Sequence, residues 1–125
     1  MISMVTKGNC TFLNATGDVN ATDIVVQTTK CLSDKKTDTY LWDFSHASKI
    51  DISTEEMKGI ASSIQEVPMN GKVRKVALVS SKNINIGLLK VFVAIAEIHN
   101  SPNEHRVFRN IELAKDWLQK TTGGN

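Results

Sequence analysis

The strongest constraint on the fold is a repeated alternation between short apolar runs and stretches with helical periodicity. The runs at residues 40–45, 73–81 and 105–108 have the length of buried strands. Each is followed by a stretch in which apolar residues recur every three or four positions, the period of an amphipathic helix. Strands that alternate with helices are typical of a largely parallel sheet with right-handed crossovers. The sequence therefore predicts an α/β fold.

The N-terminal part adds a hairpin to this pattern. Residues 2–5 and 10–15 are short apolar or β-branched runs, and Gly8 and Asn9 between them tolerate the positive φ of a tight turn. A first helical stretch follows the hairpin. The predicted order is ββαβαβαβα, a mostly parallel sheet with an antiparallel N-terminal hairpin, packed with four helices.

Side chains that can accept backbone hydrogen bonds precede three of the predicted helices. Asn20 or Thr22 can cap the first helix. Ser53 stands three residues before Glu56, the S-x-x-E pattern of a capping box, so a helix is expected to open at Ser53. Asn110 is expected to cap the last helix.

The length and composition of the chain indicate one domain. We expect it to span residues 1–125, because 125 residues with 41% hydrophobic content can bury a core of their own. No membrane span or secretion signal is predicted, since no segment approaches the ~20 apolar residues of a span. Cys10 and Cys31 stand singly, without the spacing of a zinc site or a disulfide framework. We therefore expect a cytoplasmic protein.

A local excess of basic residues lies in the second half of the chain. Between Glu66 and Glu97 there is no acidic residue. The basic residues in this interval are Lys72, Arg74, Lys75, Lys82 and Lys90. The net charge is only +2, and no aromatic residues are interleaved with the basic ones as a stacking platform requires. We expect a solvated basic face and no nucleic-acid partner.

The polar stretch at residues 43–54, DFSHASKIDIST, raises the question of catalysis. Ser45 and His46 are neighbours at a strand end, so their side chains point to opposite faces and cannot act together as nucleophile and base. His99 and His105 have no partner four residues away that would suggest a metal site. The sequence therefore predicts no enzyme activity, no metal and no cofactor.

Two short motifs resemble a known family. TGDVN at residues 16–20 is similar to the TG[DE][LV][DN] that closes an early strand of STAS domains, and residues 43–54 resemble the STAS signature D-L-S-x-V-x-x-I-D-S-S-G. The resemblance implies a SpoIIAA-like fold and a non-enzymatic role in binding a partner kinase. Phosphorylation of a serine in the signature loop abolishes that binding in the family. The implied partner-binding loop consists of Asp43, Ser45, His46, Asp51, Ser53 and Thr54.

The sequence departs from the family where the switch lies. The acceptor serine of the family follows the aspartate that Asp51 resembles, and here that position is Ile52. Ser53 resembles the second serine of the signature, and Thr54 replaces its glycine. Phosphorylation at the family position is therefore excluded, while Ser53 and Thr54 are candidate phosphorylation sites. The departures resemble a branch of SpoIIAA-like proteins that is also similar to CRAL-TRIO lipid carriers.

The helical stretch at residues 83–99 has more apolar surface than a sheet contact needs. Val91 and Ile98 lie apart from the residues expected to cover the sheet. A homodimer contact, a bound small apolar ligand or a neighbouring helix would each explain them. The expected ligand or dimer surface consists of Trp42, Phe44, Val91, Phe92, Ile95 and Ile98.

The two candidate functions predict different interiors. A protein-binding domain predicts a filled core and a polar loop surface. A ligand carrier or sensor predicts instead a cavity lined by the region near Phe92 and by Trp42 or Phe44.

Overall fold

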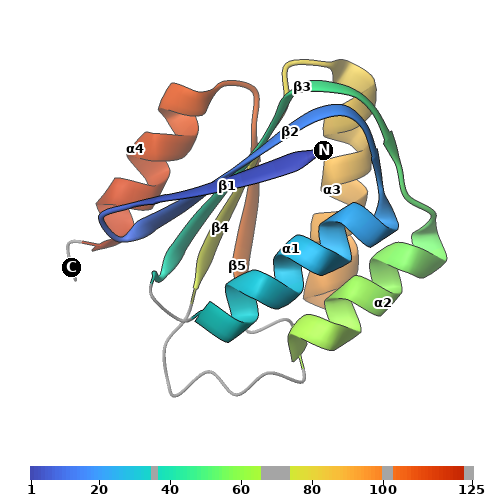
Figure 1. The fold of residues 1–125 in the computed structure, drawn as a ribbon, viewed down its shortest axis with the longest axis horizontal. Coiled ribbons are helices and arrows are strands. Elements are labelled where there is room, and N and C mark those ends of the chain that lie inside the picture. The colour runs from blue at the N-terminus through green and yellow to red at the C-terminus, as the bar shows by residue number, and fades with distance from the viewer. Residues whose placement is uncertain (35–36, 66–73, 100–102, 123–125) are drawn as a thin grey trace.

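The computed structural model describes residues 1–34, 37–65, 74–99 and 103–122 of the chain. Its elements follow the predicted ββαβαβαβα order (Figure 1). They are β1 (Ile2–Lys7), β2 (Cys10–Asn20), α1 (Ala21–Asp34), β3 (Thr39–Asp51), α2 (Thr54–Gln65), β4 (Lys75–Val79), α3 (Asn83–Ile98), β5 (Glu104–Phe108) and α4 (Ile111–Thr122). None of the helices in these ranges is both long and apolar enough to cross a membrane.

The five strands form one mixed sheet in the order β1-β2-β3-β4-β5. The β1–β2 pair is antiparallel, and the other three pairs are parallel. Gly8 occupies the hairpin turn with a φ of 58°, a conformation that costs glycine little because it has no Cβ. The predicted α/β fold, with its antiparallel hairpin and otherwise parallel sheet, is confirmed.

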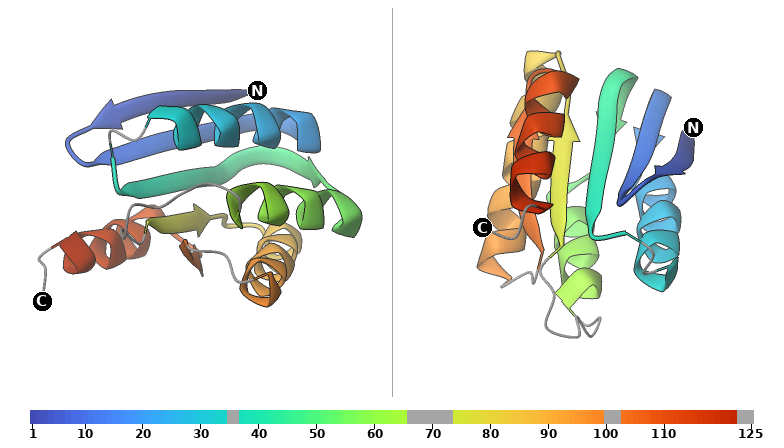
Figure 2. Two further views of the ribbon diagram at one scale, coloured as in Figure 1. Left: turned by 90° about the horizontal axis from the view of Figure 1, so that it is seen from below. Right: turned by 90° about the vertical axis from the view of Figure 1, so that its left-hand side faces the viewer.

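Helices cover the two faces of the sheet unequally. Figure 1 shows α4 on one side of the sheet and the other three helices on the opposite side. The views in Figure 2 show the sheet between these layers and α1 beside the hairpin. The face under α1, α2 and α3 holds the larger core cluster, which includes Trp42 and Leu78. The face under α4 packs Leu41 and Val79 against Leu118.

Strand β3 is the central strand, and its residues alternate between these two faces. Tyr40, Trp42 and Phe44 belong to the cluster under the three helices, whereas Leu41 belongs to the cluster under α4. Each of these side chains is at most 7% exposed. A period of two with both faces buried is what a parallel strand covered by helices requires.

Strand β3 is longer than the sequence predicts. The expected strand covered residues 40–45, but β3 continues to Asp51 and leaves only Ile52 and Ser53 before α2. The reason is its pairing with β2, which continues as far as Asn20↔Asp51 and satisfies the backbone groups of a segment that reads as a loop. Strand β4 is shorter than the expected 73–81 run, whose first residue lies outside the described residues.

Candidate functional site

The carboxyl ends of β2 and β3 bring two helix starts together. Asn20 pairs with Asp51 in the sheet, and α1 and α2 begin within three residues of these positions. Asn20 Oδ1 accepts a hydrogen bond from the Asp23 N–H at 3.0 Å, and Asp23 Oδ2 accepts one from the Asn20 N–H at 3.2 Å. The first helix therefore begins with a reciprocal cap at Asn20, one of the two residues expected to provide it.

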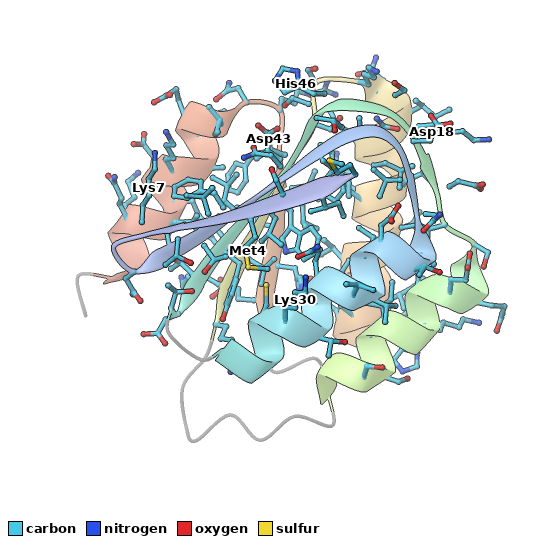
Figure 3. All side chains as sticks on the ribbon, viewed as in Figure 1. Met4, Lys7, Asp18, Lys30, Asp43 and His46 are labelled. Atoms are coloured by element: carbon cyan, nitrogen blue, oxygen red, sulfur yellow. The ribbon has the colours of Figure 1, made fainter. Side chains whose placement is uncertain are left out.

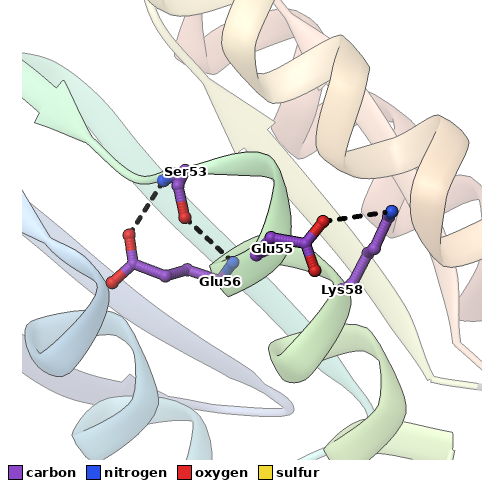
Figure 4. A network of polar contacts seen from close by, with 4 residues as sticks. All are labelled: Ser53, Glu55, Glu56 and Lys58. Atoms are coloured by element: carbon purple, nitrogen blue, oxygen red, sulfur yellow. Dashed lines mark hydrogen bonds and ion pairs between the residues drawn. The ribbon is translucent and has the colours of Figure 1, made fainter.

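Helix α2 begins with the predicted capping box (Figure 4). Ser53 Oγ accepts from the Glu56 N–H at 3.1 Å, and Glu56 Oε1 accepts from the Ser53 N–H at 2.9 Å. The Ser53 hydroxyl thus serves as a helix cap. Thr54, the first residue of the helix, is exposed.

The surface around these caps carries several carboxylates. We call its exposed residues the acidic edge: Asp18, Asp51, Ser53, Thr54, Glu55 and Glu56. Lys49 and Lys58 also lie there, and Lys58 Nζ is 3.4 Å from Glu55 Oε1. The acids outnumber these lysines, and carboxylates in the first turn of a helix interact favourably with its dipole. This surface therefore favours cationic over anionic partners.

The other predicted loop residues lie further back along β3. Asp43 is buried, and its Oδ1 accepts a hydrogen bond from the Ser45 N–H at 2.9 Å. Ser45 is half-buried and His46 is exposed. Figure 3 shows Asp43 and His46 in the upper half of the molecule, with His46 above Asp43. Asp43 and Asp51 are on the order of 20 Å apart at the usual rise of a strand, so the six residues do not form one compact loop.

Two irregularities bend β3 between these groups. The register with β2 gains one residue in β3 between Asp43 and His46 and another between Ala47 and Lys49. Lys82, which precedes α3, donates from Nζ to the Ala47 carbonyl at 2.8 Å and so ties the bent segment to the helix. Sequence reasoning missed this contact, because nothing local connects Lys82 with a carbonyl 35 residues earlier.

A cavity of about 80 Å³ lies on the face of the sheet under α1, α2 and α3. Trp42, Phe44 and Phe92 line it. The rings of Trp42 and Phe44 are stacked with centroids 6.1 Å apart. Other apolar lining residues are Ile24, Tyr40, Ile50, Met57, Ile60, Val76, Leu78, Leu88 and Leu89. The interior thus has the hollow that the ligand-binding alternative expects, and the filled core expected of a protein-binding domain is not found in this part of the described structure.

Ile52 also lines this cavity. It is half-buried and lies between two exposed residues, Asp51 and Ser53. The side chain at the position of the family's acceptor serine therefore turns inward and packs on the core. This position links the acidic edge to the cavity beneath it.

One end of the cavity is polar. Arg74, Asn103 and His105 line it beside Thr28 and Cys31. Arg74 is 7% exposed, and among the described residues its Nη1 has no hydrogen-bond partner. The imidazole of His105 lies 5.5 Å from the Phe92 ring in an edge-on arrangement, and burial lowers the pKa of His105 to about 4. Its ring is therefore neutral at neutral pH.

The expectation of a solvated basic face is wrong for Arg74. Its side chain is buried because it lies two residues before Val76 and so points to the same covered face of the sheet. Lys75 points to the opposite face, where its Nζ lies 3.3 Å from Glu104 Oε2 and 5.0 Å from the Trp117 ring centroid. Lys82 and Lys90 are exposed, and Lys72 lies outside the described residues.

The predicted ligand or dimer residues lie in three places. Trp42, Phe44 and Phe92 line the cavity, while Ile95 is buried in a cluster with Met57 and Ala61 of α2. Val91 and Ile98 face outward from α3 and are 45% and 77% exposed. The predicted residues therefore divide between a cavity and the exposed outer face of α3, and they do not form one surface.

The ranges that the structure describes contain no group of three or more His, Cys, Asp or Glu side chains placed to hold a metal ion. No disulfide joins Cys10 to Cys31. Cys31 is buried, and burial raises the pKa of the half-buried Cys10 thiol. A raised pKa lowers the thiolate fraction on which cysteine reactivity depends.

Comparison with known proteins finds similarity in structure alone. No family model matches the sequence, and no curated protein matches it. The anti-sigma factor antagonist SpoIIAA in its unphosphorylated form superposes with a TM-score of 0.59 at 8% identity, over 98% of this chain and 99% of that one. The phosphorylated form of the Bacillus cell fate determinant SpoIIAA gives a TM-score of 0.56 at 11% identity, over 94% and 99% of the two chains.

A third similar structure is an uncharacterized protein from Shewanella loihica PV-4, from the DUF3478 family with a SpoIIAA-like fold. It gives a TM-score of 0.55 at 15% identity, over 94% of this chain and 92% of that one. Together these structures show that the chain has the SpoIIAA-like fold along nearly its whole length. This confirms the fold that the STAS resemblance implies.

Proposed function

We propose that this protein is a non-enzymatic regulatory domain of the STAS type that binds a protein partner through the acidic edge. The observation that carries the proposal is the position of this edge: it lies at the junction of β3 and α2, where the STAS signature carries its switch. SpoIIAA, which shares the fold, is described as an anti-sigma factor antagonist. Two cysteines that are not joined in a disulfide fit a cytoplasmic location.

The charge of the acidic edge predicts the character of the partner surface. Asp18, Asp51, Glu55 and Glu56 are all exposed, so a basic patch would complement them. Electrostatic complementarity of this kind mainly governs the rate of association and the choice of partner. We therefore expect a partner with a Lys- or Arg-rich surface and an association that weakens as salt is added.

Phosphorylation is not needed for binding in this proposal. Ile52 has no hydroxyl group and lines the cavity. A phosphate on Ser53 would replace the cap of α2 and face the Glu56 carboxylate that now bonds the Ser53 N–H. Both candidate residues are exposed, but the Ser53 hydroxyl already caps α2 by accepting the Glu56 N–H.

Charge reversal at the edge tests the partner proposal. The variant carries Asp51→Lys and Glu55→Lys, and the control carries Glu112→Lys and Asp116→Lys on the exposed surface of α4. Both exchange two acids for two lysines, but only the first alters the acidic edge. Cross-linked complexes captured from host extract should be lost with the edge variant and kept with the α4 variant. Equal capture by both variants would refute the proposed surface.

A second candidate function is the binding of a small apolar ligand, as a carrier or sensor. The cavity under α1, α2 and α3 favours it, because cavities lined by apolar side chains remain dry and bind apolar molecules. Ile52 lines the cavity and directly precedes Ser53, the cap of α2. A ligand that contacts Ile52 would therefore influence the acidic edge.

We also propose that two copies of the chain associate through α3. Ile84, Val91 and Ile98 are exposed and spaced by seven residues, so they form one stripe along the helix. Exposed Gly87 and Ala94 lie between them and would allow close approach of a second helix. A twofold axis at Val91 would place Ile84 of one copy against Ile98 of the other, which makes the stripe self-complementary.

A further inference from the structure

We propose that the cavity binds a small amphipathic acid, with the carboxylate of the acid on Arg74 and its apolar body between the sheet and α3. This inference rests on the second candidate function above and names the chemistry of its ligand. It is independent of whether a protein binds the acidic edge. Arg74 lies at one end of the cavity with its Nη1 unpartnered among the described residues, and most of the remaining lining is apolar.

The sheet register places Arg74 at one end of the cavity. Tyr40, Val76 and His105 are cross-strand neighbours, and all three line the cavity. Arg74 precedes Val76 by two residues and therefore lies on the same face, one step closer to the amino ends of the parallel strands. Its carbonyl accepts from the Glu104 N–H at 2.8 Å, which fixes its backbone against the start of β5.

The opposite direction along the sheet is apolar. Trp42 and Leu78 form the next cross-strand pair, and Phe44 follows two residues later on β3. Leu88, Leu89 and Phe92 of α3 also line the cavity, with the Phe92 ring edge-on to His105. The cavity therefore has one charged end and a hydrocarbon-like body, which is the polarity of an amphipathic acid.

The guanidinium of Arg74 needs a counter-charge. A buried charge is costly unless it is paired and hydrogen-bonded, and arginine keeps its charge in proteins. No ion pair joins Arg74 to an acid in the described part of the chain, and its Nη1 has no hydrogen-bond partner there. His105 is neutral and adds no competing charge. A carboxylate would supply both the charge and two acceptor oxygens in the geometry that a guanidinium favours.

The size of the cavity limits the ligand. About 80 Å³ is room for several water molecules, since a cavity needs roughly 10–15 Å³ to hold one. A short aliphatic or single-ring acid fits this space better than a long-chain lipid. Hexanoate is a suitable probe, and hexan-1-ol is its uncharged counterpart of equal chain length.

Trp42 provides the signal for a binding experiment. The chain has two tryptophans, and Trp117 packs under α4 on the other face of the sheet. In a Trp117→Phe background, emission therefore comes from Trp42 in the cavity wall. We expect hexanoate to change this emission saturably and to bind at least about tenfold more tightly than hexan-1-ol, because bonds to charged groups are the stronger ones.

Substitution of Arg74 isolates the charge. Arg74→Met should weaken hexanoate about tenfold and leave hexan-1-ol within about twofold, since it removes the counter-ion and keeps the bulk of the side chain. If this variant does not fold, Arg74→Lys gives the same test, because a lysine keeps the charge but loses the two-pronged geometry and should weaken hexanoate alone. Thr28→Leu, which adds an apolar side chain to the cavity wall, should weaken both probes.

The outcomes separate this inference from the function on which it rests. The carboxylate site would be overturned if the two probes bound with equal affinity, or if Arg74→Met did not weaken hexanoate binding. Either result would still leave an apolar ligand cavity. Failure of both probes to bind would overturn the carboxylate site and the ligand-binding function together. The partner proposal is judged separately by the charge-reversal variants.

Discussion

His105 and Arg74 respond to burial in different ways at the polar end of the cavity. Burial lowers the pKa of His105 to about 4, so its ring sheds the charge and remains in the core beside Phe92. A guanidinium cannot lose its proton in this way, so Arg74 needs a compensating partner. Burial of His105 therefore makes the stability of the protein depend on pH, whereas burial of Arg74 favours the binding of an anionic group.

The neutral His105 ring predicts a loss of stability in mild acid. Between the unfolded pKa of roughly 6.5 and the folded pKa of about 4, the unfolded chain binds a proton that the folded chain does not. The contribution is therefore complete above about pH 6.5 and declines as the pH falls toward 4. At about pH 5 the loss should be roughly 2 kcal/mol in the free energy of unfolding.

Denaturant titrations at neutral pH and at about pH 5 measure this loss. His105→Gln should remove most of it, whereas the matched control His46→Gln replaces an exposed histidine and should keep it. The explanation would be wrong if the two variants showed the same dependence on pH.

Local sequence patterns predict the helix-capping residues but not the burial of Arg74. Asn20, Ser53 and Asn110 were expected as helix caps, and each accepts a backbone N–H three residues further on. A cap needs only its own helix, so the sequence is sufficient. The burial of Arg74 depends on α3 and β5, which come later in the chain. The local indication of burial was that Arg74 and Val76 are two residues apart in a strand and so share a face. The neighbouring basic residues made the segment resemble a solvated surface instead.

At the scale of elements, the ends of β2 and β3 and the start of α2 together form the acidic edge. The register irregularities between Asp43 and Lys49 bend β3, and its pairing with β2 then continues to Asp51. The capping box fixes where α2 begins, only two residues after the strand ends. The exposed side chains of the edge are thus held by regular structure on both sides.

The capping box should contribute measurably to stability. Ser53→Ala removes the acceptor of the Glu56 N–H and should lower the free energy of unfolding by about 1 kcal/mol. Ser63→Ala on the same helix is the matched control, because the Ser63 hydroxyl only donates to the Gly59 carbonyl at 3.0 Å. It should change stability by no more than a few tenths of a kcal/mol. Denaturant unfolding would contradict this account if the two variants lost equal amounts.

The order of the elements was predictable, but the length of β3 was not. Apolar runs and helical periodicity are properties of neighbouring residues, so they predict ββαβαβαβα directly. The extension of β3 depends on β2, a strand about thirty residues earlier in the chain that supplies its hydrogen-bond partners. Residues 46–51 are mostly polar, and no local pattern marks them as strand.

At the scale of the whole molecule, three features lie on separate parts of one SpoIIAA-like fold. The acidic edge lies at the carboxyl ends of β2 and β3, the cavity lies between the sheet and three helices, and the apolar stripe lies on the outer face of α3. Each suits non-covalent association. Ile52 connects the first two, because it lines the cavity where the family's signature carries its acceptor serine. We therefore expect this chain to work by non-covalent binding, without a covalent switch at the junction of β3 and α2.

Native mass spectrometry of the protein isolated from its own host, followed by a second mass after denaturation, can decide between these two modes of action. We expect a native mass of two chains with a small acid bound. Denaturation should release the acid and leave an unmodified polypeptide. A phosphate that remains on Ser53 or Thr54 after denaturation would contradict this expectation, because it would show that the junction carries a covalent switch.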